Sequence, residues 1–369
     1  MSNSTTDIAS QENGLLQQDR FIVGPDDRIL VTGAAGFIGS RVLQNLLDRG
    51  LRNLVCFVRP SSELSGIEAI IGRRPPGARI EVRKGNLLSR EDCEAAAKDV
   101  AVIYHLAAGT GEKSFPDAFL NSVVATRNLI EASLRFGSLQ RFVLVSSFAV
   151  YSNCDKPSPN ILDESCPIEE HPELRGDAYS FAKVRQEQLV TEYGKNAGMP
   201  YVLVRPGSVY GGIKSDITGR VGISAFGPFL HLGGSNTIPF TYVDNCADAI
   251  VLAGLVKGVD GEAFNVVDDD LPSSRKFLRL YKKSAKNFKS IYVPHAMSYA
   301  LCYFWEKYSK WSERQLPPAF TRKRWHSEWK KTRYSNQKLK SKLGWMPKVS
   351  TAEGLRRYID ACTRGRRYA

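Results

Sequence analysis

The chain has neither cysteine pairs at metal-binding spacing nor an apolar run long enough to cross a bilayer. Its seven cysteines are scattered without a Cys-x-x-Cys pair: Cys56, Cys93, Cys154, Cys166, Cys246, Cys302 and Cys362. An odd, unpatterned set is typical of reduced thiols, so we expect neither a disulfide framework nor a zinc or other metal site. Because no run of about 18 apolar residues occurs, we expect no membrane-spanning helix.

The N-terminal residues also lack the apolar core of a signal peptide, since residues 1–20 are polar. We expect residues 1–25 to form a disordered tail on a cytoplasmic protein. The 369 residues, 43% hydrophobic and 24% charged, suffice for one large or two moderate domains with a buried core. This composition excludes a disordered chain, a collagen and a coiled coil.

Acidic residues are scarce in the last quarter of the chain. Residues 271–369 hold 25 Lys and Arg against five Asp and Glu, a balance of +20, whereas the first 270 residues carry −7. This basic quarter is expected to face a phosphorylated substrate, an anionic membrane, an acidic partner or simply solvent. No nucleic-acid-binding motif accompanies the charge, so we do not expect nucleic acid as a partner.

A helical pattern of aromatic and apolar residues lies within the basic quarter. From Ala296 onward it comprises Met297, Ala300, Leu301, Phe304, Tyr308 and Trp311. The spacing predicts an amphipathic helix, whose apolar face would ordinarily pack against the protein's own core. The nearby Lys307 and Lys310 also permit an interfacial helix, which gives the hypothesis of peripheral attachment to an anionic membrane. The competing interpretation places the basic residues in the substrate cleft.

The first 270 residues alternate short apolar runs with helical patterns. The predicted strands are Arg28–Thr32, Leu54–Val58, Ile80–Lys84, Val102–His105, Arg141–Ser146, Tyr201–Arg205 and Ala263–Val267. The predicted helices include Ile38–Asp48, Arg90–Ala97, Phe119–Arg135 and Tyr179–Asn196. Continuous apolar strands separated by helices indicate a parallel sheet covered on both faces.

A glycine-rich turn follows the first predicted strand. Gly33, Gly36 and Gly39 are spaced three residues apart, and Phe37 and Ile38 separate the last two. The first glycine permits a tight turn, the second lets the backbone approach a pyrophosphate, and the third lets the helix pack closely on the strand. The helix N-terminus adds N–H donors and positive potential. Between a strand and a helix, this turn predicts a dinucleotide site.

The second predicted strand ends at Arg59, which Ser61 and Ser62 follow. Sites for NAD usually place an acidic residue here, on the ribose 2′-hydroxyl. A cation with two hydroxyls suits a 2′-phosphate instead. We therefore expect NADP(H), with NAD(H) as the alternative, although an arginine here can also be merely exposed.

Seven short motifs follow one another between residues 27 and 270. They are T-G-A-A-G-F-I-G at 32–39, G-N-L at 85–87, Y-H-L-A-A-G at 104–109, V-S-S-F-A-V-Y at 145–151, Y-S-F-A-K at 179–183, R-P-G-S-V-Y-G at 205–211 and Y-V-D-N-C-A-D-A at 242–249. Together they resemble the extended short-chain dehydrogenases/reductases, the NAD-dependent epimerase/dehydratase group. The resemblance implies an α/β fold with a Rossmann-type doubly wound parallel sheet and a smaller C-terminal α/β substrate-binding domain.

The resemblance also sets the expected domain boundaries. Residues 26–206, with the returning segment 241–267, are expected to form the Rossmann dinucleotide-binding domain. Residues 207–240 and 268–369 are expected to form the substrate-binding domain, basic and largely helical.

Tyr179 and Lys183 lie four residues apart and therefore share one face of a predicted helix. Tyrosine is a poor base at its ordinary pKa near 10, and a neighbouring ammonium lowers that pKa. The pair is thus a candidate acid–base unit for hydride transfer, and Lys183 can also hold the nicotinamide ribose. The resemblance implies that Ser147 orients the substrate oxygen, with the adjacent Ser146 as the competing choice, and that Asn121 supports the active site.

Further cofactor contacts are implied by the resemblance alone. They are Asn86, Leu87, Leu106, Ala107, Ala108, Pro206, Gly207 and Val209. Asn86 stands where the family usually has Asp to receive the adenine amino group, a role that an amide oxygen can still perform. Asp244 and Asn245 are expected to stabilise the junction with the substrate-binding domain.

Departures from the family motifs disfavour several branches. Phe148 and Ala149 stand where the 4,6-dehydratases carry an Asp-Glu pair, and the cysteine–histidine pair of the fucose-type epimerase–reductases has no match. Residues 236–241 lack the arginine that helps many nucleotide-sugar enzymes hold a diphosphate. Residues 233–236 instead resemble the branch of hydroxysteroid dehydrogenases and related carbonyl reductases.

We therefore predict an NAD(P)-dependent dehydrogenase or reductase that acts on a secondary alcohol or ketone of a small metabolite by a Ser-Tyr-Lys mechanism. The alternative is a nucleotide-sugar 4-epimerase with tightly held NAD, which the basic C-terminal quarter favours and Arg59 disfavours. A cofactor-binding regulator or scaffold without turnover is disfavoured by the intact Ser147, Tyr179 and Lys183. The resemblance also implies a homodimer.

Overall fold

The computed structural model describes residues 19–109, 114–153, 161–212, 217–224, 228–312 and 320–367. At its centre lies a parallel sheet of seven strands in the order β12-β7-β5-β4-β1-β2-β3. The strands are β1 (Arg28–Thr32), β2 (Asn53–Val58), β3 (Arg79–Lys84), β4 (Val102–His105), β5 (Arg141–Val145), β7 (Tyr201–Pro206) and β12 (Ala263–Val266). All seven predicted strands are confirmed, with ends that differ by at most one residue.

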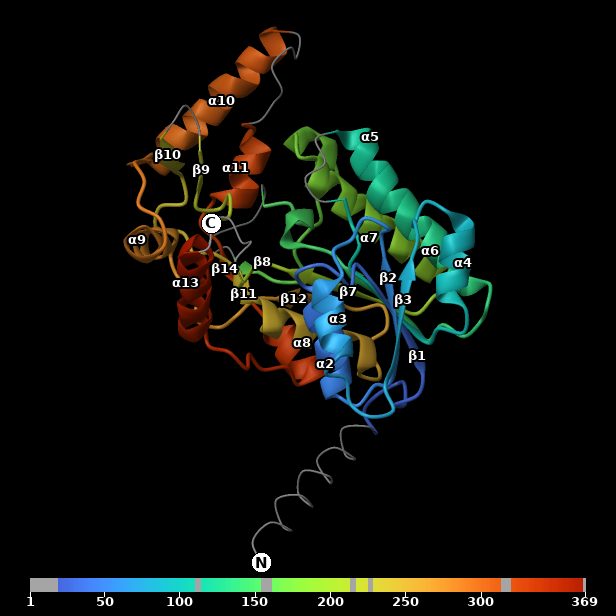
Figure 1. Ribbon diagram of the computed structural model, residues 1–369. Coiled ribbons are helices and arrows are strands. Elements are labelled where there is room, and N and C mark those ends of the chain that lie inside the picture. The colour runs from blue at the N-terminus through green and yellow to red at the C-terminus, as the bar shows by residue number, and fades with distance from the viewer. Residues whose placement is uncertain are drawn as a thin grey trace, which may run out of the picture.

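Helices cover both faces of the sheet (Figure 1). One apolar core joins the sheet to α2 (Gly39–Asp48), α3 (Ser65–Ile71) and α8 (Val243–Leu255), and the other joins it to α4 (Arg90–Ala97), α6 (Ala125–Leu134) and α7 (Ala178–Ala197). Successive side chains of one strand enter different cores, as Leu30 and Val31 do. Burial on both faces explains why the strands other than the edge strand β3 consist largely of apolar residues.

The helix predicted over 119–135 is interrupted. The structure has a short α5 (Phe115–Ala118), a π-helical turn η1 (Phe119–Val124), and then α6. Within the turn, Ser122 Oγ accepts from the Gly109 N–H at 3.0 Å, and the Ser122 carbonyl accepts from Thr126 Oγ1 at 2.6 Å. Such turns are frequent at functional sites, and this one carries Asn121.

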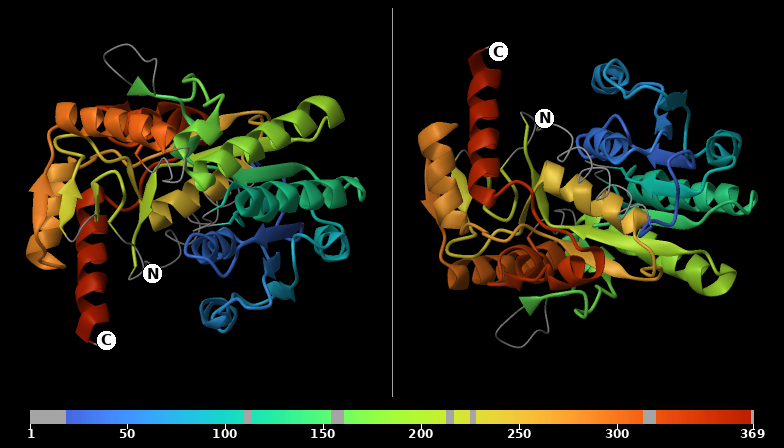
Figure 2. Two further views of the ribbon diagram at one scale, coloured as in Figure 1. Left: turned by 90° about the horizontal axis from the view of Figure 1, so that it is seen from above. Right: turned by 90° about the horizontal axis from the view of Figure 1, so that it is seen from below.

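The remaining elements are grouped on one side of the sheet (Figure 1). Short strands pair as β6 (Ile161–Leu162) with β14 (Arg333–Tyr334), β8 (Ser208–Tyr210) with β11 (Phe240–Tyr242), and β10 (Phe229–His231) with both β9 (Gly222–Ser224) and β13 (Ser290–Tyr292). The helices are η2 (Phe148–Val150), η3 (Pro172–Arg175), α9 (Ser274–Ser284), α10 (His295–Trp311), α11 (Arg322–Glu328), α12 (Gln337–Leu343) and α13 (Thr351–Arg367). Figure 2 shows α13 projecting from the body in both views.

The expected N-terminal tail is shorter than predicted. Phe21 and Val23 are buried, Phe21 forms an isolated bridge with Val256, and the Ile22 N–H donates to Leu255 O at 2.8 Å. The apolar side chains therefore hold this segment against the end of α8. The placement of residues 1–18 lies outside the described part of the chain.

The structure describes most of the cysteines and the helices of the chain. Six cysteines there form no disulfide, and no cluster of His, Cys, Asp and Glu could hold a metal ion. Cys154 lies outside the described residues. Among the helices that the structure describes, none has the length and apolarity needed to cross a membrane.

Candidate active site

The turn between β1 and α2 has a backbone conformation and a close packing that only glycine allows. Gly33 has a φ of +71°, and a Cβ on Gly39 would lie 2.1 Å from the Gly33 carbonyl oxygen. Helix α2 starts after Ile38 with no side-chain cap and no acidic residue in its first turn. Unblocked N–H donors and the positive end of the helix dipole fit an anion, and this cradle fits the pyrophosphate of a dinucleotide.

A cavity of about 730 Å³ extends from this turn past the carboxyl ends of the central strands. It lies where the strand order reverses between β1 and β4, the usual ligand position in an open α/β sheet. Every site residue expected from the sequence lines it: Gly33, Gly36, Phe37, Ile38, Gly39, Arg59, Asn86, Leu87, Leu106, Ala107, Ala108, Asn121, Ser147, Tyr179, Lys183, Pro206, Gly207 and Val209.

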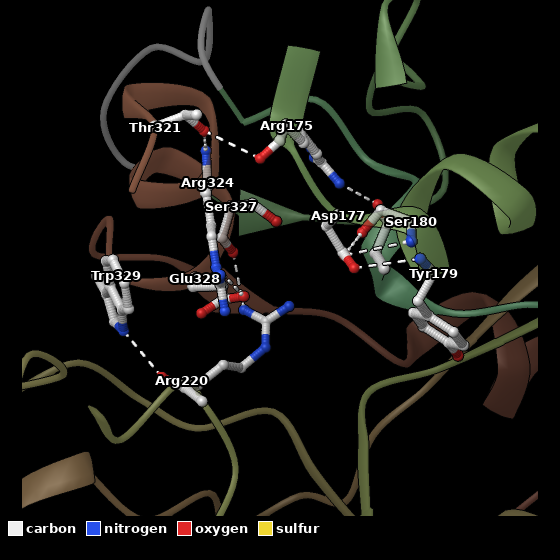
Figure 3. A network of polar contacts seen from close by, with 12 residues as sticks. Arg175, Asp177, Tyr179, Ser180, Arg220, Thr321, Arg324, Ser327, Glu328 and Trp329 are labelled. Carbon is white, nitrogen blue, oxygen red and sulfur yellow. Dashed lines mark hydrogen bonds and ion pairs between the residues drawn. The ribbon is translucent and has the colours of Figure 1, made fainter. Parts of the chain in front are cut away.

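Tyr179 is placed by the N-terminal cap of α7. The carboxylate of Asp177 accepts from the N–H groups of Tyr179 and Ser180, both at 3.2 Å (Figure 3). Burial raises the pKa of Tyr179, while a hydrogen bond with the Ser147 side chain acts in the opposite direction. Ser147 is therefore the serine that reaches the phenol.

Ser146, the competing serine, has different surroundings. Its hydroxyl is buried, lines the same cavity, and has no hydrogen-bond partner among the described residues. An unpaired buried hydroxyl is costly. Ser146 is thus a candidate ligand contact, whereas Ser147 is the partner of Tyr179.

Lys183 is buried one helical turn after Tyr179. Its ammonium donates to the Val145 carbonyl at 2.7 Å and lies 6.0 Å from the centroid of the Tyr179 ring. Burial lowers the pKa of Lys183 to about 8, against the opposing charge of Glu187. The pKa of Tyr179 is raised overall, because burial of the phenol outweighs its hydrogen bond with Ser147, and the Lys183 ammonium is directed to the Val145 carbonyl.

A buried ion pair that the sequence reasoning missed supports this helix. Arg205 donates to both carboxylate oxygens of Glu187, at 2.9 and 2.6 Å, and to the Tyr151 hydroxyl at 2.9 Å. The Tyr151 hydroxyl in turn donates to Asn265 Oδ1 at 2.7 Å. The network connects α7 to β7 and β12, and the sequence separation of its members left no local signal.

A second missed group fixes the loop after Ser147. The guanidinium of Arg175 donates to the carbonyls of Ala149 and Tyr151, and Thr321 Oγ1 donates to the Arg175 carbonyl at 3.2 Å. Figure 3 shows Thr321, directly before α11, in contact with Arg175, the last residue of η3. Among these residues only Asp177 could have been predicted from the sequence, because an acidic residue directly before a helical pattern indicates an N-terminal cap.

At the adenine end, Asn86 has a partner of its own. Its side-chain Oδ1 accepts from the Leu88 N–H at 3.0 Å, and its backbone N–H donates to Asp92 Oδ2 at 2.7 Å. A carbonyl oxygen has two lone pairs, so the amide oxygen retains one acceptor position. Glu63, which the sequence reasoning did not include, lines the cavity together with Arg59.

The segment around Asn245 joins distant parts of the chain. Asn245 Nδ2 donates to Asp268 Oδ1 at 3.0 Å and to the Val349 carbonyl at 2.7 Å, and its Oδ1 accepts from the Val349 N–H. Asp244 lies 3.4 Å from Arg41 of α2. These contacts are structural and lie outside the cavity lining.

The seven-stranded sheet and the glycine turn at its switch point define a Rossmann-type dinucleotide-binding protein. Residues 29–266 match the model of the NAD dependent epimerase/dehydratase family, and the chain belongs to this family. Its members are NAD-dependent dehydrogenases, epimerases and dehydratases, so the protein is an enzyme of this kind.

The relatives of this chain include a hydroxysteroid dehydrogenase and nucleotide-sugar enzymes. A 3beta-hydroxysteroid-dehydrogenase/decarboxylase of Arabidopsis thaliana is 25% identical over 357 residues, covering 90% of this chain and 79% of the relative. An uncharacterised UDP-glucose epimerase of Bacillus subtilis is 28% identical over 276 residues, covering 69% and 80%. Among solved structures, the UDP-glucuronic acid 4-epimerase of Bacillus cereus, in complex with UDP-glucuronic acid and NAD, has a TM-score of 0.68 at 24% identity, covering 91% and 99%.

Proposed function

We propose that the protein transfers a hydride between a nicotinamide cofactor and a secondary alcohol or ketone of a small metabolite. The observation that carries the proposal is the convergence of Ser147, Tyr179 and Lys183 on the cavity that begins at the glycine turn. Hydride transfer needs a dinucleotide held beside a group that moves the hydroxyl proton. Both parts belong to one continuous cavity.

Several residues would hold the cofactor, which supplies the hydride donor or acceptor when bound. The glycine turn and the N-terminus of α2 would bind the pyrophosphate. Lys183 would donate to the nicotinamide ribose. Arg59, with Ser61 and Ser62 beside it on the cavity wall, would bind a 2′-phosphate, which is why we propose NADP(H).

The proton steps fall to three side chains. Ser147 would hold the substrate oxygen, and the Tyr179 hydroxyl would give or take its proton. The Lys183 ammonium, one helical turn away, would stabilise negative charge that develops on the phenol, against the rise in pKa that burial causes. Asp177 keeps Tyr179 in place at the start of α7.

A nucleotide-sugar 4-epimerase is the second candidate, and Arg220 favours it. Arg220 donates to the Ser327 carbonyl at 3.0 Å and to the Tyr334 hydroxyl at 3.4 Å. The Tyr334 ring stacks on Phe148, the residue after Ser147, at 5.6 Å between centroids. Figure 3 shows the guanidinium directed toward the side of the view that holds Tyr179. A cation there suits an anionic group on the substrate.

One experiment separates the candidates. The purified protein would be denatured to identify any retained nucleotide, then assayed on steroid, aliphatic and nucleotide-sugar alcohols and ketones with each nicotinamide cofactor. Net, stoichiometric change in nicotinamide absorbance supports the oxidoreductase. Retained NAD with inversion of a nucleotide sugar and no net redox change supports the epimerase. Cofactor binding without turnover on any compound contradicts both.

A further inference from the structure

Helix α10 carries an apolar stripe that the rest of the described chain leaves uncovered. Its members recur at intervals of three or four residues: Met297, Leu301, Phe304, Tyr308 and Trp311. At about 100° per residue they fall within one narrow arc of the helix. Phe304 is 66% exposed and Trp311 is 78% exposed. The preferred sequence expectation, that this face packs against the core, is therefore wrong.

The opposite side of α10 makes the contacts that hold it to the protein. Ser298 and Cys302 are buried there, and the Ser298 hydroxyl accepts from Trp325 Nε1 of α11 at 2.8 Å. Trp305 packs edge-on against Phe320. Figure 1 shows the helix running outward from the body, and its contacts with α11 include the ion pair of Glu306 with Arg322. The stripe is therefore a ridge rather than the floor of a groove.

Cations lie along one edge of this ridge. Lys307 and Lys310 are exposed, and Lys307 and Arg322 both lie over the ring of Tyr303, at 5.7 and 5.2 Å. Within α10 the single acidic residue, Glu306, is paired with Arg322 at 2.8 Å. An aromatic and aliphatic face bordered by lysines is typical of helices that lie in the interface of an anionic bilayer.

We propose that α10 is an interfacial membrane helix, whose stripe enters the headgroup region of an anionic lipid bilayer while the adjacent cations bind lipid phosphates. Charge favours this occupant over a second copy of the chain, because a dimer through α10 would bring two quarters of +20 together. A convex ridge ending in Tyr308 and Trp311 also fits a deformable layer, where amphipathic rings reside at the headgroup level.

Co-sedimentation of the full chain with vesicles tests the proposal. The vesicles are phosphatidylcholine alone, or phosphatidylcholine mixed with phosphatidylserine, each at low and high salt. The wild type should bind the anionic vesicles at low salt and lose binding at high salt. The double variant F304S/W311S should bind at least about tenfold more weakly, and the double variant K307E/K310E about fivefold more weakly for each cation removed.

Two controls make each outcome decisive. Met346→Ser removes another exposed apolar side chain, from the segment between α12 and α13, and should bind like the wild type. Circular dichroism and sedimentation velocity of each variant report folding and self-association. No binding of the wild type to anionic vesicles at low salt overturns the proposal. So does a folded F304S/W311S variant that binds like wild type, or one whose only change is conversion from dimer to monomer.

Discussion

Glu187 and Arg205 form a buried, two-point ion pair one helical turn beyond Lys183, with N–O distances of 2.9 and 2.6 Å. The pair joins the helix of Tyr179 to strand β7 of the seven-stranded sheet. The negative charge of Glu187 also partly offsets the loss of pKa that burial imposes on Lys183. The Glu187 carboxylate therefore both anchors α7 to the sheet and raises the pKa of Lys183.

Removal of this carboxylate should be strongly destabilising. Glu187→Gln leaves the Arg205 guanidinium buried without its counter-charge, and we expect a loss of about 3–5 kcal/mol in unfolding free energy. Urea unfolding measures it. Glu192→Gln, an exposed carboxylate on the same helix, is the control and should change stability by less than about 0.5 kcal/mol. Similar losses of unfolding free energy in both variants would show that the buried ion pair stabilises the protein no more than an exposed carboxylate does.

The lowered pKa of Lys183 makes the stability of the protein depend on pH. Burial lowers it from the ordinary 10.5 to about 8, so between these values the unfolded chain binds the proton that the folded chain has lost. Stability from this group therefore rises with pH through that window, and the full cost of burial is present below it. The neutral variant Lys183→Met should be more stable than wild type by up to about 3 kcal/mol near pH 7.

The stability difference between the two proteins should shrink by about pH 10, where both carry a neutral residue 183 in the folded state. Urea unfolding of both proteins at each pH measures it. Comparing the variant with wild type at one pH cancels the titration of every other group. Comparing the two pH values cancels the constant loss of the Val145 hydrogen bond. A difference that stays the same at both pH values would contradict the lowered pKa.

Turnover should depend on the Tyr179 hydroxyl. Tyr179→Phe removes only the proton-moving group and should reduce kcat by at least about 10²-fold on the substrate identified by the panel. Cofactor affinity should change little, whereas Lys183→Ala should weaken both turnover and cofactor binding. Steady-state kinetics and calorimetric titration provide the two measurements. Near-normal turnover of Tyr179→Phe would remove this residue from the mechanism.

Cofactor preference should follow the charge at position 59. Arg59→Asp should weaken NADP(H) binding by about 1.5–3 kcal/mol, because it removes a charge-assisted contact and introduces repulsion of the 2′-phosphate. Calorimetric titration of wild type and variant with NADP(H) and NAD(H) measures it. If the wild type binds NAD(H) as tightly as NADP(H), the proposed preference fails.

The glycine turn should tolerate no side chain at position 39. Gly39→Ala places a methyl 2.1 Å from the Gly33 carbonyl, so the backbone of the turn must shift, and we expect loss of dinucleotide binding with reduced stability. Gly66→Ala in α3 is the matched control, because nothing lies within 4 Å of its added Cβ. It should raise stability by about 0.5–1 kcal/mol. Equal cofactor binding by wild type and Gly39→Ala would contradict the role of this turn.

Local sequence patterns predicted the central sheet, and the site residues that they singled out line one cavity. Most of the strands are recognisable because both faces are buried, which makes them continuous apolar runs of limited length. The edge strand β3 instead alternates apolar and charged residues. The glycine spacing, the Tyr179–Lys183 interval and the motif order are also local. They suffice to place the cofactor cavity because parallel strands bring their carboxyl ends to one edge.

The tertiary structure alone decided the rest, because its contacts join residues far apart in the chain. Glu187 meets Arg205, and Thr321 meets Arg175, across separations that carry no periodic signal. Phe21 and Val23 were assigned to a tail because their burial depends on α8. The pattern of Met297, Leu301 and Phe304 predicted an amphipathic helix, yet a sequence period cannot say which face meets the core. Only the packing of Cys302 and Ser298 against α11 shows that the aromatic stripe faces outward.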